Sequence, residues 1–403
     1  MKKYVLLIVA MIVVLAAIAA CAPAPTATPV PPTAAPKPTE APKPTAVPPT
    51  AAPKPTDVPK PTTAPTDAPK PTDVPKPTTA ATAAPAVAKC EKLAGALAPK
   101  AGELGAADKP IVITFVPSVD TTIITKGGTA MADCLGKITG LAFKVEVGTS
   151  ETASVEAMGG NRAQMGFLNT FAILLAKQKY DVDVALVAQR KYGVLLPDGK
   201  YTAFDFDADK ALAGQLTAFY KPEYFTKAGS SIKKLEDVKG KSMCFTSASS
   251  TSGGIIPRAS FAALGIDPDK DMKSTYAGGH DKAAIAVYQG DCDAGVAFMD
   301  VLTDKPTNLV GKFPDIGQKV TVFAVGDRIP NDGLQFVKGL DPKIRTLVTD
   351  ALLAMMKDPG GNAVVKSIYN YDAFEQADYA KYYAPFSEML KKAGIDVAKL
   401  VRQ

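Results

Sequence analysis

The feature that most constrains this chain is an alternation of apolar runs typical of buried strands with longer runs typical of helices. In its first part, the alternation predicts strands at 111–116, 143–147, 164–168 and 184–188, with helices at 131–138 and 152–158. Strands that alternate with helices favour an α/β fold, in which right-handed crossovers join the parallel strands of one sheet.

The alternation starts again after Gly240. It now predicts strands at 242–245, 274–276, 294–298 and 320–325, helices at 255–263 and 283–289, and a mainly helical stretch over 342–401. Extended segments near 215–220 and 321–325 connect the two series. We therefore expect two lobes joined by a hinge, with a ligand bound between them, beyond the carboxyl ends of the strands.

The chain before residue 88 does not follow this pattern. Lys2 and Lys3 precede an apolar run over residues 4–20, and Cys21 follows small residues. This order predicts a lipoprotein signal peptide at 1–20, with Cys21 as the lipidated first residue of the mature protein. A signal cleaved without lipidation and an uncleaved membrane anchor remain alternatives. All three place the rest of the chain outside the cytoplasm.

Residues 22–87 consist mainly of Pro, Thr, Ala and Lys. Proline removes backbone donors, and too few apolar side chains are present to offset the entropy of folding. We therefore expect 21–87 to form a disordered, Pro/Thr-rich tether between the lipid anchor and the folded part.

From residue 88 onwards the chain is long enough for a large core in two lobes. We expect the first lobe over 88–218, the second over 219–322, and a return to the first lobe with C-terminal helices over 323–403. The formal charge of +6 comes partly from the lysines of the tether, and no basic block suggests binding of nucleic acid. No second apolar run is long enough for a channel subunit. We expect a monomer that needs no cofactor.

Besides Cys21 the chain has four cysteines, Cys90, Cys134, Cys244 and Cys292. An even number in an exported domain favours disulfides, with three possible connectivities. We favour the pairs Cys90–Cys134 and Cys244–Cys292, although four buried free thiols remain an alternative. Because no two cysteines have the Cys-x-x-Cys spacing, a zinc or thioredoxin-type site is disfavoured.

A hydroxyl-rich segment, Ser247 to Gly254, follows a predicted strand and opens a predicted helix. Ser250, Thr251 and Ser252 supply neutral donors, and the start of a helix adds unpaired N–H groups with a partial positive charge. This combination predicts an anion site. An ordinary Ser/Thr-rich turn that caps a helix is the alternative.

Three further polar residues follow predicted strands. His280 is the only histidine, which excludes most histidine-based metal sites, and it follows two glycines that allow close approach of a ligand. Its imidazole could donate to an oxyanion or have a structural role. Asp300 lies at the carboxyl end of a strand, on the expected cleft side, and Asp332 has a comparable place. For each carboxylate an exposed turn is the alternative.

The stretch from Lys239 to Gly253 reads KGKSMCFTSASSTSG and is followed by Pro257. It resembles the phosphonate/phosphite/phosphate-type periplasmic binding proteins of ABC importers, whose pattern is a GK-strand, an STSG run and a later proline. The segments 278–281, 289–293 and 329–332 match the G-x-H, G-x-x-D and I-P-x-D motifs of the family in the same order. The resemblance covers about 111–336.

The resemblance implies a two-lobed flytrap fold that closes around its ligand. It also implies that the oxygens of an anion are held by Ser250, Thr251, Ser252 and His280. Asp300 occupies the place where some members hold a ligand amine, and Asp332 matches a second such acid. Many members carry a cleft-facing aromatic residue at the position of Glu151, and often a tyrosine at that of Ile173. The first-lobe donors expected here are Ser118, Asn169 and Thr170.

Together these features predict a non-enzymatic, extracytoplasmic solute-binding protein, anchored by lipid to the cell membrane. It would deliver a small phosphorus oxyanion (phosphonate, phosphite or phosphate) to the permease subunits of an ABC importer. Alternatives are a different small anion, a receptor that feeds a sensor, and a secreted serine hydrolase. The hydrolase lacks a Gly-x-Ser-x-Gly elbow.

Overall fold

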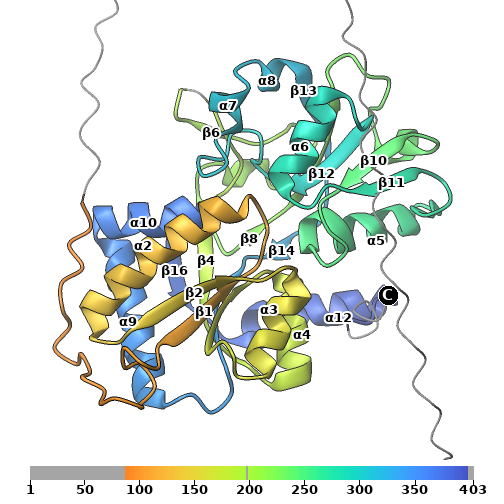
Figure 1. Ribbon diagram of the computed structural model, residues 1–403. Helices are drawn as coiled ribbons and strands as arrows, with labels where there is room; N and C mark the ends of the chain where they lie inside the picture. Colours follow the sequence, from red (N-terminus) through yellow and green to blue (C-terminus); the bar gives the residue numbers. More distant parts are fainter. Residues whose placement is uncertain (1–86, 197, 398–403) are drawn as a thin grey trace, which may run out of the picture. The chain divides into compact units, whose positions relative to one another are not determined.

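The computed structural model describes residues 87–196 and 198–397 (Figure 1). The predicted signal peptide, Cys21 and the tether up to residue 86 lie outside these residues. Among the helices of the described part, none is both long and apolar enough to span a bilayer.

The first lobe contains a mixed sheet with the strand order β16-β4-β15-β3-β1-β2, and β7 pairs with β4. Its strands are β1 Ile111–Phe115, β2 Phe143–Val147, β3 Met165–Leu168, β4 Asp183–Lys191, β7 Leu216–Thr217, β15 Gly333–Phe336 and β16 Ala373–Gln376. Strand β1 is parallel to β2 and β3, whereas β15 is antiparallel to both β3 and β4. The four predicted strands, β1 to β4, therefore run parallel to one another as expected, but the sheet is mixed, because the chain returns from the second lobe and inserts β15 between β3 and β4.

The second lobe contains a five-stranded sheet with the order β11-β10-β12-β9-β13. Its strands are β9 Pro222–Lys227, β10 Ser242–Phe245, β11 Lys273–Tyr276, β12 Ala294–Phe298 and β13 Val320–Val325. Strand β10 is parallel to β11 and β12, and β9 is antiparallel to β12 and β13. This sheet is mixed as well.

Two short strands, β8 Phe219–Tyr220 and β14 Ile329–Pro330, carry the chain between the lobes and pair with each other (Figure 1). The outgoing crossover lies where 215–220 was expected to connect the lobes. The returning crossover was expected near 321–325, which is wrong, because these residues form the edge strand β13 and the crossover follows them. The expected lobe boundary at residue 323 thus falls inside β13.

Helices of the first lobe are α2 Thr121–Thr139, α3 Glu151–Gly159, α4 Thr170–Tyr180, α9 Pro342–Lys357, α10 Pro359–Tyr369, α11 Tyr379–Tyr382 and α12 Ala384–Lys392. Those of the second lobe are α5 Ile256–Ala263, α6 His280–Gln289, α7 Leu309–Lys312 and α8 Ile316–Lys319.

Helix α2 begins ten residues before the predicted start at residue 131. Its first half contains Gly127 and Gly128, which lower helix propensity, so the sequence did not indicate a helix there. A Cβ at Gly127 would lie 2.8 Å from Ile368, so close packing requires this glycine.

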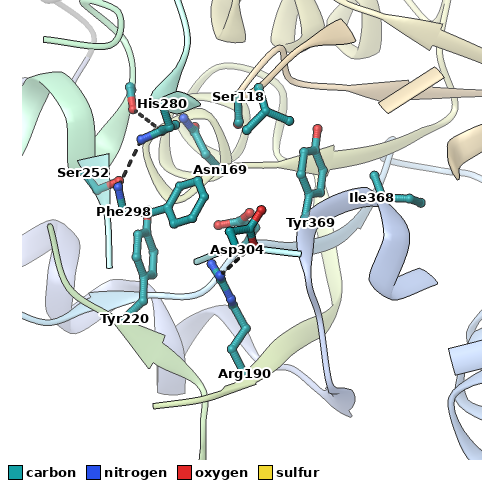
Figure 2. A pocket seen from close by; sticks show the side chains of 13 residues that line it. Ser118, Asn169, Arg190, Tyr220, Ser252, His280, Phe298, Asp304, Ile368 and Tyr369 are labelled. Carbon is teal, nitrogen blue, oxygen red and sulfur yellow. Dashed lines mark hydrogen bonds and ion pairs between the residues drawn. The ribbon is translucent and has the colours of Figure 1, made fainter. Parts of the chain in front are cut away.

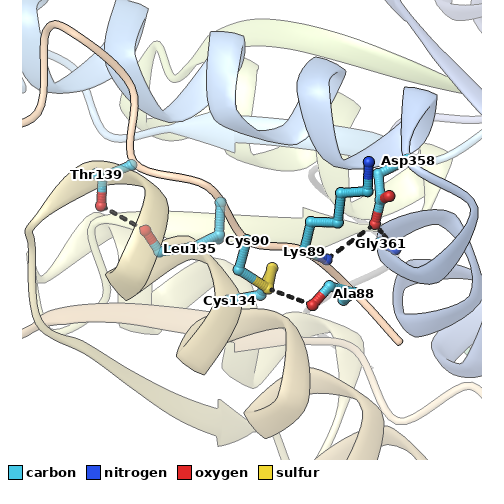
Figure 3. The surroundings of a disulfide bond; sticks show 8 residues. All are labelled: Ala88, Lys89, Cys90, Cys134, Leu135, Thr139, Asp358 and Gly361. Atoms are coloured by element: carbon cyan, nitrogen blue, oxygen red, sulfur yellow. Dashed lines mark hydrogen bonds between the residues drawn. A yellow bond between two sulfur atoms is a disulfide. The ribbon is translucent and has the colours of Figure 1, made fainter. Parts of the chain in front are cut away.

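Two disulfides tie elements together within the lobes. Cys90 joins the segment before the first strand to Cys134 of α2, with their Cα atoms 5.1 Å apart (Figure 3). Cys244 of β10 is joined to Cys292 just before β12, with a Cα–Cα distance of 5.9 Å. The pairs agree with the connectivity favoured above, and thiol titration before and after reduction tests them in solution.

Candidate functional site

A small cavity of about 40 Å³ lies between the two lobes (Figure 2). Its walls come from the loops that follow strands of both sheets, from β4, and from the crossover strand β8. The lining residues are Ser118, Val119, Asn169, Arg190, Tyr220, Ser250, Ser252, His280, Phe298, Asp304, Asp332, Ile368 and Tyr369. Six of the nine predicted ligand-binding residues are among them.

The hydroxyl-rich segment forms one wall of the cavity. Ser250 caps a π-helical turn, Thr251–Ile255, and its Oγ accepts a hydrogen bond from Gly253 N at 3.1 Å. A Cβ at Gly254 would lie 2.1 Å from the carbonyl oxygen of Ser247, so only glycine lets the chain fold back here. The local sequence therefore places Ser250 and Ser252 at the start of a helix, where backbone donors are unpaired.

His280 is fixed as a neutral donor. Its Nδ1 accepts the N–H of Phe298 at 3.1 Å, so in the neutral ring Nε2 carries the proton. Burial and the charge of Arg190 lower the pKa of His280 to about 3. Nε2 lies 3.2 Å from Ser250 Oγ, which also accepts from Gly253. Because both lone pairs of Ser250 are used, its hydroxyl hydrogen remains for a ligand.

Arg190, near the end of β4, was not predicted as a site residue. Its Nη2 lies 3.8 Å from Asp304 Oδ1, and its Cζ lies 5.0 Å from the ring centroid of Phe298 (Figure 2). Within the described residues the guanidinium has no hydrogen-bond partner, so its five donors are available to a ligand. The one available signal was a charged residue two positions after the apolar run 184–188.

Two carboxylates face the same cavity. Asp304 Oδ2 accepts from Thr307 N at 3.2 Å, and Asp332 Oδ2 accepts from the Tyr371 hydroxyl at 2.8 Å. Burial raises the pKa of both acids, and the charge of Arg190 opposes this rise. The cavity therefore combines one permanent cation with two acids, each of which already accepts a hydrogen bond from the protein.

The structure does not place Asp300 in this cavity, contrary to expectation. Its carboxylate accepts from Leu195 N at 3.0 Å and from the Thr303 hydroxyl, and its own N–H donates to Glu223 Oε2 at 3.2 Å. The backbone of Asp300 has φ 77°, which turns the chain so that Asp304 lies at the cavity instead.

Two predicted threonines make structural contacts instead of lining the cavity. Thr251 Oγ1 accepts from Phe171 N at 2.9 Å, and Thr170 donates to the carbonyl of Pro330 at 2.5 Å. The other two first-lobe residues do line it, and each also contacts the second lobe. His280 N donates to Ser118 O at 3.0 Å, and Asn169 Nδ2 donates to Ser249 O at 3.4 Å.

Glu151 does not line the cavity. It begins α3, is 3% exposed, and accepts hydrogen bonds from Ser247 Oγ at 2.8 Å and Ser249 Oγ at 2.6 Å. The carboxylate also lies at a helix N-terminus, where negative charge is favourable. Glu151 thus joins the first lobe to the hydroxyl-rich segment of the second, in place of a cleft-facing aromatic residue.

We expect Glu151→Gln to weaken ligand binding about tenfold, because two charge-assisted hydrogen bonds between the lobes become neutral ones. Calorimetric titration measures this loss. Glu156→Gln is the matched control, since Glu156 lies on the same helix and bonds only Lys179 and Tyr180 of its own lobe. Equal losses in both variants would contradict a role in closure.

The fold and the interlobe cavity define a two-lobed solute-binding protein. The sequence model of one family, described as ABC transporter, phosphonate, periplasmic substrate-binding protein, matches residues 113–382, and the chain belongs to this family.

A curated relative, the phosphate-import protein PhnD of Mycolicibacterium smegmatis, is 42% identical over 81 residues. The match covers 18% of this chain and spans only 25% of the relative.

Two solved structures share the fold. A binding protein component of an ABC phosphonate transporter from Pseudomonas aeruginosa has a TM-score of 0.54 at 16% identity, covering 73% of this chain and 97% of that one. PhnD1 from Prochlorococcus marinus, in complex with methylphosphonate, has a TM-score of 0.55 at 16% identity, covering 70% and 98%.

Proposed function

We propose that this protein captures a small phosphorus oxyanion (phosphate, phosphite or a small phosphonate) between its lobes and delivers it to the permease of an ABC importer. The observation that carries the proposal is the convergence of Arg190 with a neutral donor, the Ser250 hydroxyl that His280 orients, on one small cavity. A guanidinium that is only partly exposed and has unused donors is suited to the oxygens of a tetrahedral anion. The names of the relatives, one a phosphate importer and one bound to methylphosphonate, support this ligand class.

The two acids restrict the ligand further. A fully ionised dianion would meet the negative charges of Asp304 and Asp332, whereas an oxyanion that keeps one P–OH group donates a hydrogen bond to either. The cavity of about 40 Å³ favours a compact ligand over one with an extended amine substituent. If the ligand carries an amine, Asp332 is the acid that would bind it, because Asp300 does not line the cavity.

Ser250 and His280 are in contact, which would also suit a serine hydrolase, but their hydrogen bonds do not. Nε2 of His280 is the donor in this pair, and Nδ1 takes the N–H of Phe298 where a hydrolase would have a carboxylate. With its pKa lowered to about 3, the imidazole is a poor general base. We therefore propose binding and delivery without catalysis.

The proposed setting follows from the N-terminal sequence. The lipid on Cys21 would hold a monomer at the outer face of the membrane, and the tether would let the two lobes reach the permease. Lobe closure around the anion would create the surface that the permease recognises.

Calorimetric titration of the full-length protein tests the ligand class. The panel is phosphate, phosphite, methylphosphonate and 2-aminoethylphosphonate, with sulfate as a tetrahedral dianion that carries no proton near neutral pH. We expect at least one compact phosphorus oxyanion to bind at least tenfold more tightly than sulfate. Binding of none of the phosphorus compounds would overturn the oxyanion assignment, and equal binding of sulfate would overturn the role of the two acids.

A further inference from the structure

A buried group of charges lies on the two crossover strands, apart from the cavity. Lys221 directly follows β8, and its Nζ lies 2.8 Å from Asp207 Oδ1 and 2.9 Å from Asp209 Oδ2. Arg328 directly precedes β14, and its Nε donates to Asp209 Oδ2 at 2.9 Å. Asp209 thus binds one cation from the outgoing crossover and one from the returning crossover.

Most of the group is closed off from solvent, whereas the side chain of Arg328 is 56% exposed. Lys221 is 6% exposed and Asp207 2%, and Asp207 also accepts from the Tyr192 hydroxyl at 2.6 Å. The guanidinium of Arg328 lies over the ring of Phe219, 4.3 Å from its centroid. Ion pairs buried this deeply contribute little net stability, but they fix geometry, because breaking one leaves an unpaired charge inside the protein.

Both acids belong to a segment, 192–217, that leaves the first lobe at the cavity and returns to it there. It begins directly after β4, which carries Arg190, and it ends at β7, where Thr217 pairs with Arg190. It contains the short hairpin β5 Val194–Leu195 and β6 Tyr201–Thr202. The segment therefore connects the backbone of the cavity's cation to the crossover strands.

A second contact strengthens the same connection. Asn331, directly after β14, is 1% exposed, and its Nδ2 donates to Ala188 O and to Thr217 O, each at 3.0 Å. The returning crossover is thus bonded to β4 and to β7 at once. Any rotation about the crossover strands must strain these bonds or the ion pairs of Asp209.

We propose that segment 192–217 is a hinge clamp, in which Asp207 and Asp209 tie the two crossover strands together and so restrict the angle between the lobes. In this role Asp207, Asp209, Lys221 and Arg328 are positioning residues, since none of them lines the cavity. The clamp restricts the angles that the lobes can sample, so that closure around the anion brings Arg190 opposite Ser250 and His280. Pre-organisation of this kind acts mainly by slowing ligand dissociation.

The test uses the full-length protein with Asp209→Asn and Arg328→Met. Asp209→Asn removes the carboxylate charge that Lys221 and Arg328 share. Arg328→Met removes only the ion pair between Asp209 and the returning crossover. Because the side chain of Arg328 is 56% exposed, this variant is expected to fold even if Asp209→Asn does not. Asp205→Asn is the control, since Asp205 lies on the same segment but is exposed and pairs only with Lys210.

Two readouts separate positioning from stability. The first is the ligand-free distance between dyes at exposed positions of α9 and α5, measured by fluorescence energy transfer, which needs no knowledge of the ligand. In both variants we expect a distance distribution that is longer or broader than that of wild type. In the control we expect the wild-type distribution. The second readout rests on the proposed function: for the tightest ligand of the panel, dissociation should accelerate about tenfold in Asp209→Asn and about threefold in Arg328→Met.

Distances and dissociation rates like those of wild type, with only a lower melting temperature, would overturn the clamp and leave a structural ion-pair cluster. If no oxyanion of the panel binds, the proposed function fails, while the ligand-free distance still decides on the clamp.

Discussion

Replacing Arg190 by Met is expected to weaken oxyanion binding at least a hundredfold without unfolding the protein. Arg190 is the only permanent cation among the residues that line the cavity, so without it Asp304 and Asp332 dominate the charge there. The loss corresponds to about 3 kcal/mol, in the range for charge-assisted, bidentate hydrogen bonds to an anion. Calorimetric titration with the tightest ligand of the panel measures it.

Two variants calibrate this result. Arg190→Lys keeps the charge but loses the planar fork, and we expect it to bind with intermediate affinity. Arg162→Met removes an exposed arginine of the first lobe and should bind like wild type. Wild-type affinity in Arg190→Met would show that the anion is held elsewhere.

Replacing Glu223 by Gln is expected to raise the free energy of unfolding at pH 8 by about 3 kcal/mol. Burial raises the pKa of Glu223 to about 8, and its Oε1 has no hydrogen-bond partner among the described residues. The neighbouring Asp300 has a pKa raised to about 7, again chiefly by burial. Above the ordinary pKa of 4.5 the unfolded chain loses the proton that the folded protein keeps.

The folded state therefore binds more protons than the unfolded chain between about pH 4.5 and pH 8, and wild-type stability falls as the pH rises through this window. Glutamine does not titrate, so Glu223→Gln should lack this part of the slope. Urea denaturation at pH 5 and at pH 8 measures the difference, with the exposed Glu236→Gln as control. The same pH dependence in wild type and Glu223→Gln would contradict a buried, protonated Glu223.

Strands with a clear local pattern were predicted to the residue: β10 and β12 by their apolar runs, and β2 by its alternation of apolar and charged residues. Strands β9 and β16 were not recognised, because Pro222, Glu223 and Glu375 interrupt their apolar pattern. Glu223 is buried only because the loop after β12 covers it, and no local pattern shows that. The antiparallel orientation of β15 likewise depends on a chain that has first crossed to the other lobe and back.

The predictable part of the site was local. Ser250, Ser252 and His280 each follow a strand and begin a helix, so hydroxyl and imidazole groups could be placed at the cleft from sequence. Arg190 carries no such pattern. Whether Asp300 or Asp304 faces the cavity depends on the backbone turn at Asp300, which only the structure shows.

The most direct test of the account is a crystal structure of the protein with phosphate or methylphosphonate bound. The account predicts an anion in the interlobe cavity, with its oxygens within hydrogen-bond distance of the Arg190 guanidinium and of the Ser250 hydroxyl that His280 orients. An anion bound instead in the larger groove beside Glu151 and Lys282, with the cavity at Arg190 empty, would contradict it.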